Sequence, residues 1–306
     1  MLMNRILVTG ASGFTGVHLQ KFLQENFSGE IIPADLIMPE GLNGVKIDLL
    51  DKSQVLSLIE NIKPELIIHL AGIARSENFE DIYKSNLFTT INILDSIVQS
   101  NLSDTRILLI SSSAVYGNAV NANVAETALL NPVNHYGNSK LLVEKIAQQY
   151  IFKHKLKIIL VRPFNLFGPG QGEAFIIPAF LTQLIRIKNG LQIPVICVGD
   201  LSGKRDFIYI DEAIRAYWLI LTRGEVGEVY NVGSGYAISI QSVLETLLNL
   251  TGISCEIQTD NRRIQYHQIQ HIFADTAKIN SLGWQNTTSF KEAINNIINE
   301  YIQAHH

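Results

Sequence analysis

The 306-residue chain is predicted to form an α/β protein built on a doubly wound parallel sheet. Over the first 165 residues, short apolar runs rich in β-branched residues alternate with longer helical patterns. The strands are nearly continuous apolar runs, which is typical of parallel strands covered by helices on both faces. Hydrophobic residues make up 47% of the chain and charged residues 17%, so the chain can bury a substantial core.

The predicted elements alternate strictly between strand and helix. In order they are RILVTG, a helix from near Phe14 to about residue 26, EIIPAD, a helix near 53–62, ELIIHLAG, a helix near 79–100, RILLISSS, a helix near 135–154, and KIILVRPF. Right-handed crossovers then bring ligands to the carboxyl ends of the strands. After about residue 165 the alternation ends. We expect a first domain over 1–165, with sheet additions from about 205–235, and a smaller discontinuous α/β lobe over 166–306.

The composition argues against several classes of protein. The net charge of −4 and the pI near 6.1 give no basic surplus for binding a phosphate backbone, so no nucleic-acid partner is expected. Cys197 and Cys255 lack the spacing of a disulfide framework or a zinc site and are expected to be buried, reduced thiols. No apolar run approaches about 18 residues, and the first strand leaves no room for a signal peptide. We expect a cytoplasmic protein with no membrane partner.

A glycine-rich loop follows the first strand. Gly10, Gly13 and Gly16 stand between RILVTG and a helix, where backbone N–H groups can approach a pyrophosphate at the helix N-terminus. Such glycines can also be plain turn residues, but the strand before and the helix after favour dinucleotide binding. Asp35 ends the second strand and is expected to bind the adenosine ribose hydroxyls. The following LIMPEG offers no arginine or lysine for a 2′-phosphate, so NAD(H) is favoured over NADP(H). Asp48 either meets the adenine or caps the next helix.

Tyr136 and Lys140 lie four residues apart at the start of a predicted helix and therefore share one face. A phenol exchanges protons near neutral pH only if a positive charge lowers its pKa, and the Lys140 ammonium can supply that charge. Ser112 lies at the end of the fourth strand, in SSSAVYG. A strand-end hydroxyl and a helix-borne phenol can meet at one substrate oxygen, which predicts hydride chemistry with Tyr136 as the proton shuttle.

Taken in order, these motifs resemble those of the extended short-chain dehydrogenases/reductases that act on nucleotide sugars as epimerases, dehydratases and reductases. The similar segments span Ile6 to about Trp284 and are TGASGFTG, HLAG, SSSAVYG, YGNSK, RPFNLFGPGQ, RDFIYIDEAIRAY and YNVGSG. The resemblance implies a Rossmann-type fold with a smaller C-terminal lobe for the nucleotide sugar. It also implies a homodimer formed through the helices near 79–100 and 135–154.

The resemblance assigns roles to individual positions. The implied catalytic residues are Ser112, rather than Ser111 or Ser113, with Tyr136 and Lys140. The implied cofactor-binding residues are Gly10, Ser12, Gly13, Phe14, Thr15, Gly16, Asp35, Leu36, Asp48, Leu49, Leu70, Ala71, Gly72, Ser111, Tyr136, Lys140 and Pro163. The implied substrate-binding residues are Ser112, Ser113, Asn165, Gln171, Phe175, Ile177, Arg205 and Arg263. Arg205 would hold the diphosphate, the alternative being a surface ion pair with Asp206 or Asp200.

The residue two places after Ser112 limits which reactions of this family are expected. Dehydratases of this family carry an acid there, and this chain has Ala114, which cannot exchange a proton. The second half resembles GDP-4-keto-6-deoxy-D-mannose reductases, which implies NAD(P)H-dependent reduction of a 4-keto-6-deoxyhexose to GDP-D-rhamnose or its C4 epimer. The alternatives are an NAD-dependent nucleotide-sugar 4-epimerase and, from another class, a cofactor-sensing protein without catalysis.

Two departures from the family pattern limit this assignment. Asn86 is followed by Thr89 and Thr90 where relatives show glycine and threonine. Near the C-terminus Gln265, Tyr266, His267 and Gln268 replace the usual Arg-Pro-x-Asp, and Arg262 and Arg263 are candidates to replace that contact. His267 and His271 are four residues apart, but no third ligand is evident and no metal is expected.

Overall fold

The fold is described from a computed structural model, which covers residues 5–41, 43–119, 122–260, 262 and 271–304. Its first part consists of β1 (Arg5–Thr9), α1 (Phe14–Asn26), β2 (Glu30–Asp35), β3 (Val45–Lys46), α2 (Lys52–Ile62), β4 (Leu66–His69), α3 (Phe79–Tyr83), a π-helical turn (Lys84–Phe88), α4 (Thr89–Gln99), β5 (Arg106–Ile110), a 3-10 turn (Ser113–Tyr116), β6 (Asn123–Val124), α5 (His135–His154) and β7 (Lys157–Pro163). The predicted strand and helix order is confirmed.

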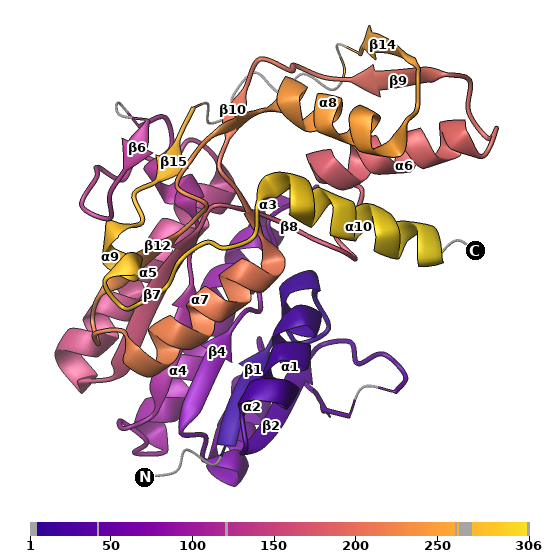
Figure 1. The fold of residues 1–306 in the computed structure, drawn as a ribbon. Helices are drawn as coiled ribbons and strands as arrows, with labels where there is room; N and C mark the ends of the chain where they lie inside the picture. Colours follow the sequence, from indigo (N-terminus) through magenta and orange to yellow (C-terminus); the bar gives the residue numbers. More distant parts are fainter. Residues whose placement is uncertain (1–4, 42, 120–121, 261, 263–270, 305–306) are drawn as a thin grey trace.

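The second part is less regular. It consists of β8 (Asn165–Phe167), α6 (Ile176–Lys188), β9 (Val195–Val198), β10 (Lys204–Arg205), β11 (Phe207–Tyr209), α7 (Ile210–Arg223), β12 (Val229–Val232), β13 (Ile238–Ser239), α8 (Ile240–Thr251), β14 (Glu256–Thr259), β15 (Phe273–Ala274), α9 (Ala277–Asn280) and α10 (Phe290–Ala304). In Figure 1, α6, α8, β9 and β14 form a separate group above the carboxyl-end side of the main sheet.

The main sheet has the order β12-β7-β5-β4-β1-β2-β3, and every pair of neighbours is parallel. The chain reverses its direction of winding between β1 and β4, which is the point where ligands bind in open α/β sheets. Successive β1 residues point to opposite faces: Ile6 and Val8 join one core cluster and Leu7 the other. The predicted α/β fold with a doubly wound parallel sheet is therefore confirmed.

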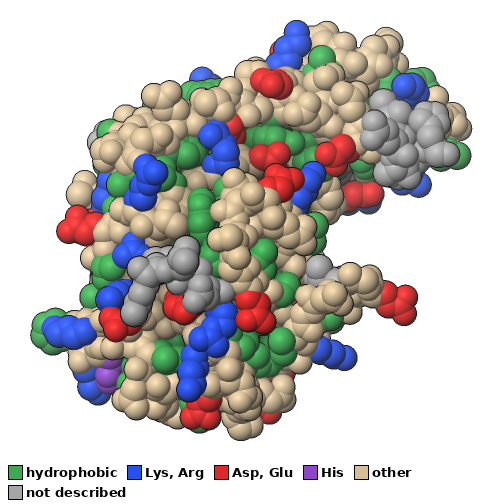
Figure 2. Space-filling view, turned by 60° about the horizontal axis from the view of Figure 1, so that its bottom comes forward, with side chains coloured by type: hydrophobic (Ala, Val, Ile, Leu, Met, Phe, Trp, Pro, Cys, Tyr) green, Lys and Arg blue, Asp and Glu red, His purple; other side chains and the backbone are tan. Residues whose placement is uncertain are grey.

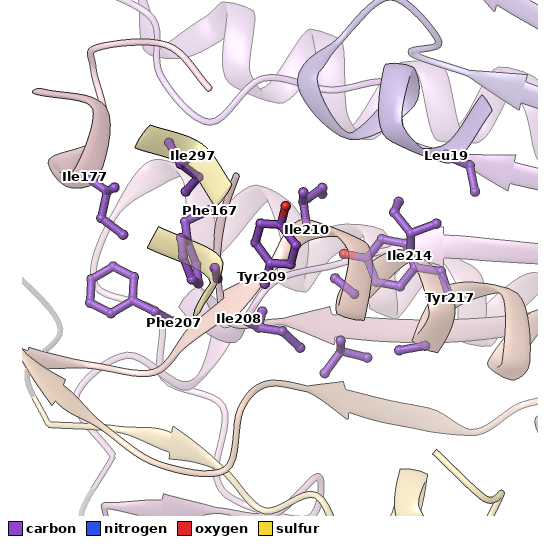
Figure 3. Packing of buried hydrophobic residues seen from close by; sticks show 14 of the residues in the cluster. Leu19, Phe167, Ile177, Phe207, Ile208, Tyr209, Ile210, Ile214, Tyr217 and Ile297 are labelled. Atoms are coloured by element: carbon purple, nitrogen blue, oxygen red, sulfur yellow. The ribbon is translucent and has the colours of Figure 1, made fainter. Parts of the chain in front are cut away.

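Aromatic rings pack together in the second part of the chain. Phe167 lies with its ring centroid 6.2 Å from Phe207, 5.8 Å from Tyr209 and 5.3 Å from Phe290. Figure 3 shows Phe167, Phe207 and Tyr209 close together, with Ile177 of α6 beside them. These three rings belong to the same core cluster as Ile6 and Val8 of β1, so the two parts of the chain share one core. The surface is hollowed at the side where the lobes meet, and charged side chains of both signs are interspersed on that face (Figure 2).

No helix of the described chain is long and apolar enough to cross a membrane.

Candidate active site

The glycine loop lies at the point where the sheet reverses its winding. Gly10 has a φ of +68°, and a Cβ there would lie 2.6 Å from the Ala71 nitrogen at the end of β4. A Cβ on Gly16 would lie 2.3 Å from the Gly10 oxygen. Only glycine allows both approaches, because any side chain would collide with backbone that cannot move aside. Gly13 is the N-cap of α1, so the helix N-terminus faces this loop.

Asp35 lies directly against the glycine loop. Its Oδ2 accepts hydrogen bonds from the Ser12 nitrogen (2.9 Å) and the Ser12 hydroxyl (2.8 Å), and its Oδ1 accepts one from the Leu36 nitrogen (2.7 Å). Asp48 is exposed, and the α2 N-cap is Asp51, which accepts from Ser53 N and Gln54 N. The capping alternative for Asp48 is therefore wrong, and contact with the adenine remains its predicted role.

These groups fit a nicotinamide adenine dinucleotide. The glycines let the backbone of the loop from Gly10 to Gly16 pack closely at the start of α1, and the helix N-terminus there favours a pyrophosphate. The Asp35 carboxylate is half-buried at the end of β2, where it can accept ribose hydroxyl protons and would repel a 2′-phosphate. The exposed Gly72 leaves the end of β4 without bulk.

Ser112 and Tyr136 meet at the end of β5. Their side chains lie close together, and the Ser112 hydroxyl opposes the rise in the pKa of the Tyr136 phenol that burial causes. The Ser112 Oγ also accepts from the Ala114 nitrogen at 3.1 Å as the N-cap of the 3-10 turn. The Asn134 side chain caps α5 by accepting from the Gly137 nitrogen (2.8 Å), which fixes where the helix bearing Tyr136 begins. The structure thus joins the predicted hydroxyl and the predicted phenol, 24 positions apart in the sequence (136 − 112).

Lys140 lies beneath this pair. Its side chain is 7% exposed, its Nζ donates to the Ile110 oxygen (2.8 Å), and Nζ lies 6.0 Å from the centroid of the Tyr136 ring. Burial lowers the pKa of Lys140 to about 8. Burial also raises the pKa of Tyr136, although the Ser112 hydroxyl opposes the shift. In the protein alone, the phenol pKa therefore moves opposite to the predicted direction, because the ammonium faces a backbone carbonyl and desolvation dominates.

Asn86 has a place in the site that the sequence did not predict. This buried residue lies in the π-helical turn Lys84–Phe88, a geometry that often marks functional sites. Its Nδ2 donates to the Ser139 Oγ (2.9 Å) and the Ile73 oxygen (3.0 Å), and its Oδ1 accepts from the Ile73 nitrogen (2.9 Å). The Ser139 hydroxyl in turn donates to the backbone carbonyl oxygen of Tyr136 (2.8 Å). Asn86 therefore joins the loop after β4 to the start of α5. The signal in the sequence was an asparagine in the middle of the helix predicted near 79–100.

The predicted substrate residues separate into two groups. Asn165 and Phe175 are exposed, Phe175 by 41%, and Gln171 is half-buried. Ile177 of α6 is 2% exposed and lies in the core beside Phe167 (Figure 3), so its side chain is turned away from the surface on which the other predicted substrate residues lie.

Arg205 is 9% exposed, at the end of β10. The neighbouring Asp206 carboxylate is fully buried and accepts hydrogen bonds from the backbone nitrogens of Ser234 (2.7 Å), Gly235 (3.2 Å) and Ala274 (3.0 Å). Asp206 is therefore not a surface partner of Arg205. It instead fixes the loop that follows β12 next to the strand carrying Arg205. Burial lowers the pKa of the Arg205 guanidinium and the charge of the exposed Asp200 opposes that shift, so the ion-pair alternative remains through Asp200.

Two further predicted cofactor residues have side chains turned away from the surface. Ser111 is fully buried and its Oγ donates to Glu144, which leaves its main chain for binding. Leu49 is 6% exposed and packs in the core, which leaves only its main chain for binding. The two cysteines are free but half-buried rather than buried.

Several predictions fall near or on residues outside the described chain. Arg263, Gln265, Tyr266, His267 and Gln268 all lie there. Arg262 is described, and its Nε lies 3.0 Å from an Asp260 oxygen. Within the described ranges, no group of three or more His, Cys, Asp or Glu side chains is placed to hold a metal ion.

The profile of the NAD dependent epimerase/dehydratase family matches residues 6–233. The chain is 31% identical to the GDP-6-deoxy-D-mannose reductase of Pseudomonas aeruginosa, over 98% of each chain. It is 29% identical to the GDP-6-deoxy-D-talose 4-dehydrogenase of Aggregatibacter actinomycetemcomitans, over 91% of each.

Solved structures agree in fold. The structure of RMD from Pseudomonas aeruginosa complexed with NADPH superposes with a TM-score of 0.84 at 30% identity, covering 98% of this chain and 99% of that one. The UDP-glucose 4-epimerase of Thermotoga maritima with UDP-glucose superposes with a TM-score of 0.90 at 24% identity, over 99% and 100%. The second likeness concerns the fold alone.

Proposed function

The chain belongs to the NAD dependent epimerase/dehydratase family, and on that premise we propose that it reduces the C4 keto group of a nucleotide-linked 4-keto-6-deoxyhexose. The preferred substrate is GDP-4-keto-6-deoxy-D-mannose, and the product is GDP-D-rhamnose or its C4 epimer. The observation that carries this proposal is that the Ser112 hydroxyl and the Tyr136 phenol lie together at the end of β5, beside Ala114. The pair can protonate an oxygen, while the alanine cannot remove a sugar proton.

Each residue of the site has a chemical task in this reaction. When bound, the nicotinamide dinucleotide supplies the hydride for C4. Ser112 accepts from the Ala114 amide, so its single hydroxyl proton is left for donation to the substrate oxygen. Tyr136 donates a proton to the alkoxide that forms at that oxygen. Lys140, charged below its pKa of about 8, stabilises the phenolate left behind and can bind the nicotinamide ribose.

Tyr136 can serve as the proton donor in this reaction. Burial raises the pKa of the phenol, so it carries its proton at neutral pH and can give it to the oxygen at C4 as hydride arrives.

The cofactor preference follows from Asp35. Its carboxylate is held toward the glycine loop by Ser12 and lies where a 2′-phosphate would approach, which supports NADH over NADPH. The solved structure of one relative contains NADPH, so any assay should compare NADH with NADPH.

The decisive experiment follows NADH and NADPH oxidation with GDP-, dTDP-, UDP- and CDP-linked 4-keto-6-deoxysugars, and identifies the products by NMR. We expect oxidation with the GDP-linked substrate and one C4 stereoisomer of product. Net epimerisation without cofactor oxidation, by protein that retains stoichiometric NAD after purification, would instead identify a 4-epimerase. Cofactor binding without turnover of any nucleotide sugar would favour a cofactor-sensing protein.

We also propose that the enzyme is a cytoplasmic homodimer. Phe79, Phe88 and Leu142 are apolar yet 51%, 50% and 42% exposed, on α3, the adjoining π-helical turn and α5. These segments contact one another, so the exposed side chains lie on neighbouring elements. Apolar side chains gathered on adjacent helices support a protein partner there. The mass in solution at micromolar concentration tests the dimer.

A further inference from the structure

A buried ion pair lies behind the catalytic serine. Glu144 of α5 and Arg162 of β7 meet through two parallel hydrogen bonds, Nε to Oε1 at 2.9 Å and Nη2 to Oε2 at 2.7 Å. Their side chains are only 2% and 4% exposed. Removing two charges from water is costly, and replacing such a pair by apolar residues is often neutral or stabilising. Stability alone is therefore a weak reason for this pair.

The ion pair holds both ends of the segment that carries Ser112. At one end, the Ser111 Oγ donates to the Glu144 Oε1 at 2.5 Å. At the other end, the Arg162 Nη1 donates to the Tyr116 hydroxyl at 2.9 Å, and the guanidinium lies 4.9 Å from the centroid of the Tyr116 ring. Ser112 lies between these two attachments.

The same ion pair is part of the helix that carries Tyr136. Glu144 lies four residues beyond Lys140 and eight beyond Tyr136, so the three side chains form one stripe along α5. A displacement of α5 along its axis or about it would move the phenol and the carboxylate together. The position of Glu144 relative to Ser111 therefore sets the position of Tyr136 relative to Ser112.

The network is closed by fixed groups on its far side. The Tyr116 hydroxyl donates to the Asn231 Oδ1 (2.7 Å), and the Asn231 Nδ2 donates to the Val124 oxygen (2.8 Å). Arg162 also donates to the Glu126 oxygen (2.9 Å). Fully satisfied buried networks are rigid, because each group that moved would lose a hydrogen bond in a low-dielectric interior.

We propose that Glu144 and Arg162 are positioning residues that fix the distance between the Ser112 hydroxyl and the Tyr136 phenol. Neither group touches the substrate. They act through Ser111 and Tyr116 at the two ends of the serine segment and through α5 at the tyrosine. This inference rests on the proposed function only in requiring that Ser112 and Tyr136 act on one oxygen, which reduction and epimerisation share.

The test compares Glu144→Gln with a matched control. Glutamine keeps an oxygen acceptor for Ser111 but loses the charge that holds Arg162. Glu212→Gln is the control, because Glu212 is also buried, pairs with Arg215 and accepts from Thr287, and it lies at the contact of α7 with the chain before α10. Both variants are expected to lose stability. Only Glu144→Gln is expected to lower kcat, by about 10- to 100-fold, since misplacement by about 1 Å can have that effect.

Further measurements separate positioning from other roles. KM for the nucleotide sugar, Kd for NADH and the pH at which activity is half-maximal are expected to stay unchanged in Glu144→Gln. Ser111→Ala and Tyr116→Phe, which release one end each, are expected to lower kcat in the same way. A rise in KM alone, a shifted pH profile, or an equal loss of kcat in Glu212→Gln would overturn the proposal.

One readout does not depend on the substrate. In crystal structures of the two proteins, the Ser112 and Tyr136 hydroxyls are expected to lie farther apart in the Glu144→Gln protein than in the wild type, because the serine segment is displaced. An unchanged distance would overturn the positioning role. If the wild-type protein reduced no 4-keto sugar but the distance increased in the variant, the proposed substrate would be wrong and the positioning role would stand.

Discussion

Replacing Lys140 by methionine is expected to make the protein more stable and inactive. Lys140 is 7% exposed, and its burial lowers the pKa of the ammonium from 10.5 to about 8. A shift of this size corresponds to about 3 kcal/mol of destabilisation at neutral pH, at 1.36 kcal/mol for each pKa unit. Methionine has a similar length and carries no charge, so it removes this cost. The loss of the hydrogen bond from Nζ to the Ile110 oxygen offsets part of the gain.

The pH dependence of the stability separates the effect of the Lys140 charge from the effect of its packing. Because the folded-state pKa of Lys140 is depressed, the unfolded chain binds more protons between pH 8 and 10.5, and stability rises with pH in that window. The cost is fully present below pH 8 and disappears above 10.5. The advantage of Lys140→Met over the wild type is therefore expected to shrink by about 2 kcal/mol between pH 7 and pH 9.5.

The assay is urea unfolding of both proteins without cofactor, followed by the fluorescence of Trp218 and Trp284. Burial, together with the charge of Lys140, also lowers the pKa of His69 to about 3, but His69 is neutral in the folded protein across this pH window, so the difference reports Lys140. Lys145→Met, an exposed site on the same helix, is the control, and its difference from the wild type should not vary with pH. A Lys140→Met difference that stays constant from pH 7 to 9.5 would refute the reasoning, as would turnover within tenfold of the wild type.

Tyr136→Phe is expected to abolish turnover while leaving cofactor affinity intact, and reduction of substrate at the parental rate would remove the proton-donor role. Tyr217→Phe is expected to raise the free energy of unfolding by about 1 kcal/mol in urea titrations, because the Tyr217 hydroxyl is buried without a hydrogen-bond partner among the described residues; lower stability would contradict this. Asp35→Asn combined with Leu36→Arg should shift kcat/KM toward NADPH by about tenfold or more, whereas an unchanged ratio would locate the selectivity elsewhere. Phe88→Glu should convert the dimer to monomers in light scattering, and a monomeric wild type would disprove the interface.

Local sequence patterns sufficed for the secondary structure and for the cofactor loop. The β1–α1 loop was predictable because Gly10, Gly13 and Gly16 recur at every third position between a strand and a helix. Tyr136 and Lys140 were predictable as neighbours because helical periodicity places positions i and i+4 together. The order of the elements followed from apolar runs that are long enough to be read directly.

Residues whose roles depend on distant partners could not be predicted in this way. Ile177 and Ser111 occupy positions that the resemblance assigns to ligands, yet packing turns one side chain into the core and the other toward Glu144. Asn86 lies in a π-helical turn, and its side chain joins the loop after β4 to the start of α5. Such orientations are decided by what surrounds each residue.

The sequence by itself determined the α/β class and the glycine loop, and it pointed to Asp35, Ser112, Tyr136 and Lys140 as candidate site residues, since each depends on spacing along the chain or on one turn of helix. The tertiary structure decided how these groups act. Burial raises the pKa of Tyr136 and lowers that of Lys140, and the buried pair Glu144 and Arg162 joins the serine segment to the tyrosine helix. Desolvation and hydrogen bonds between distant strands arise only when the chain is packed, so no linear pattern encodes their magnitude.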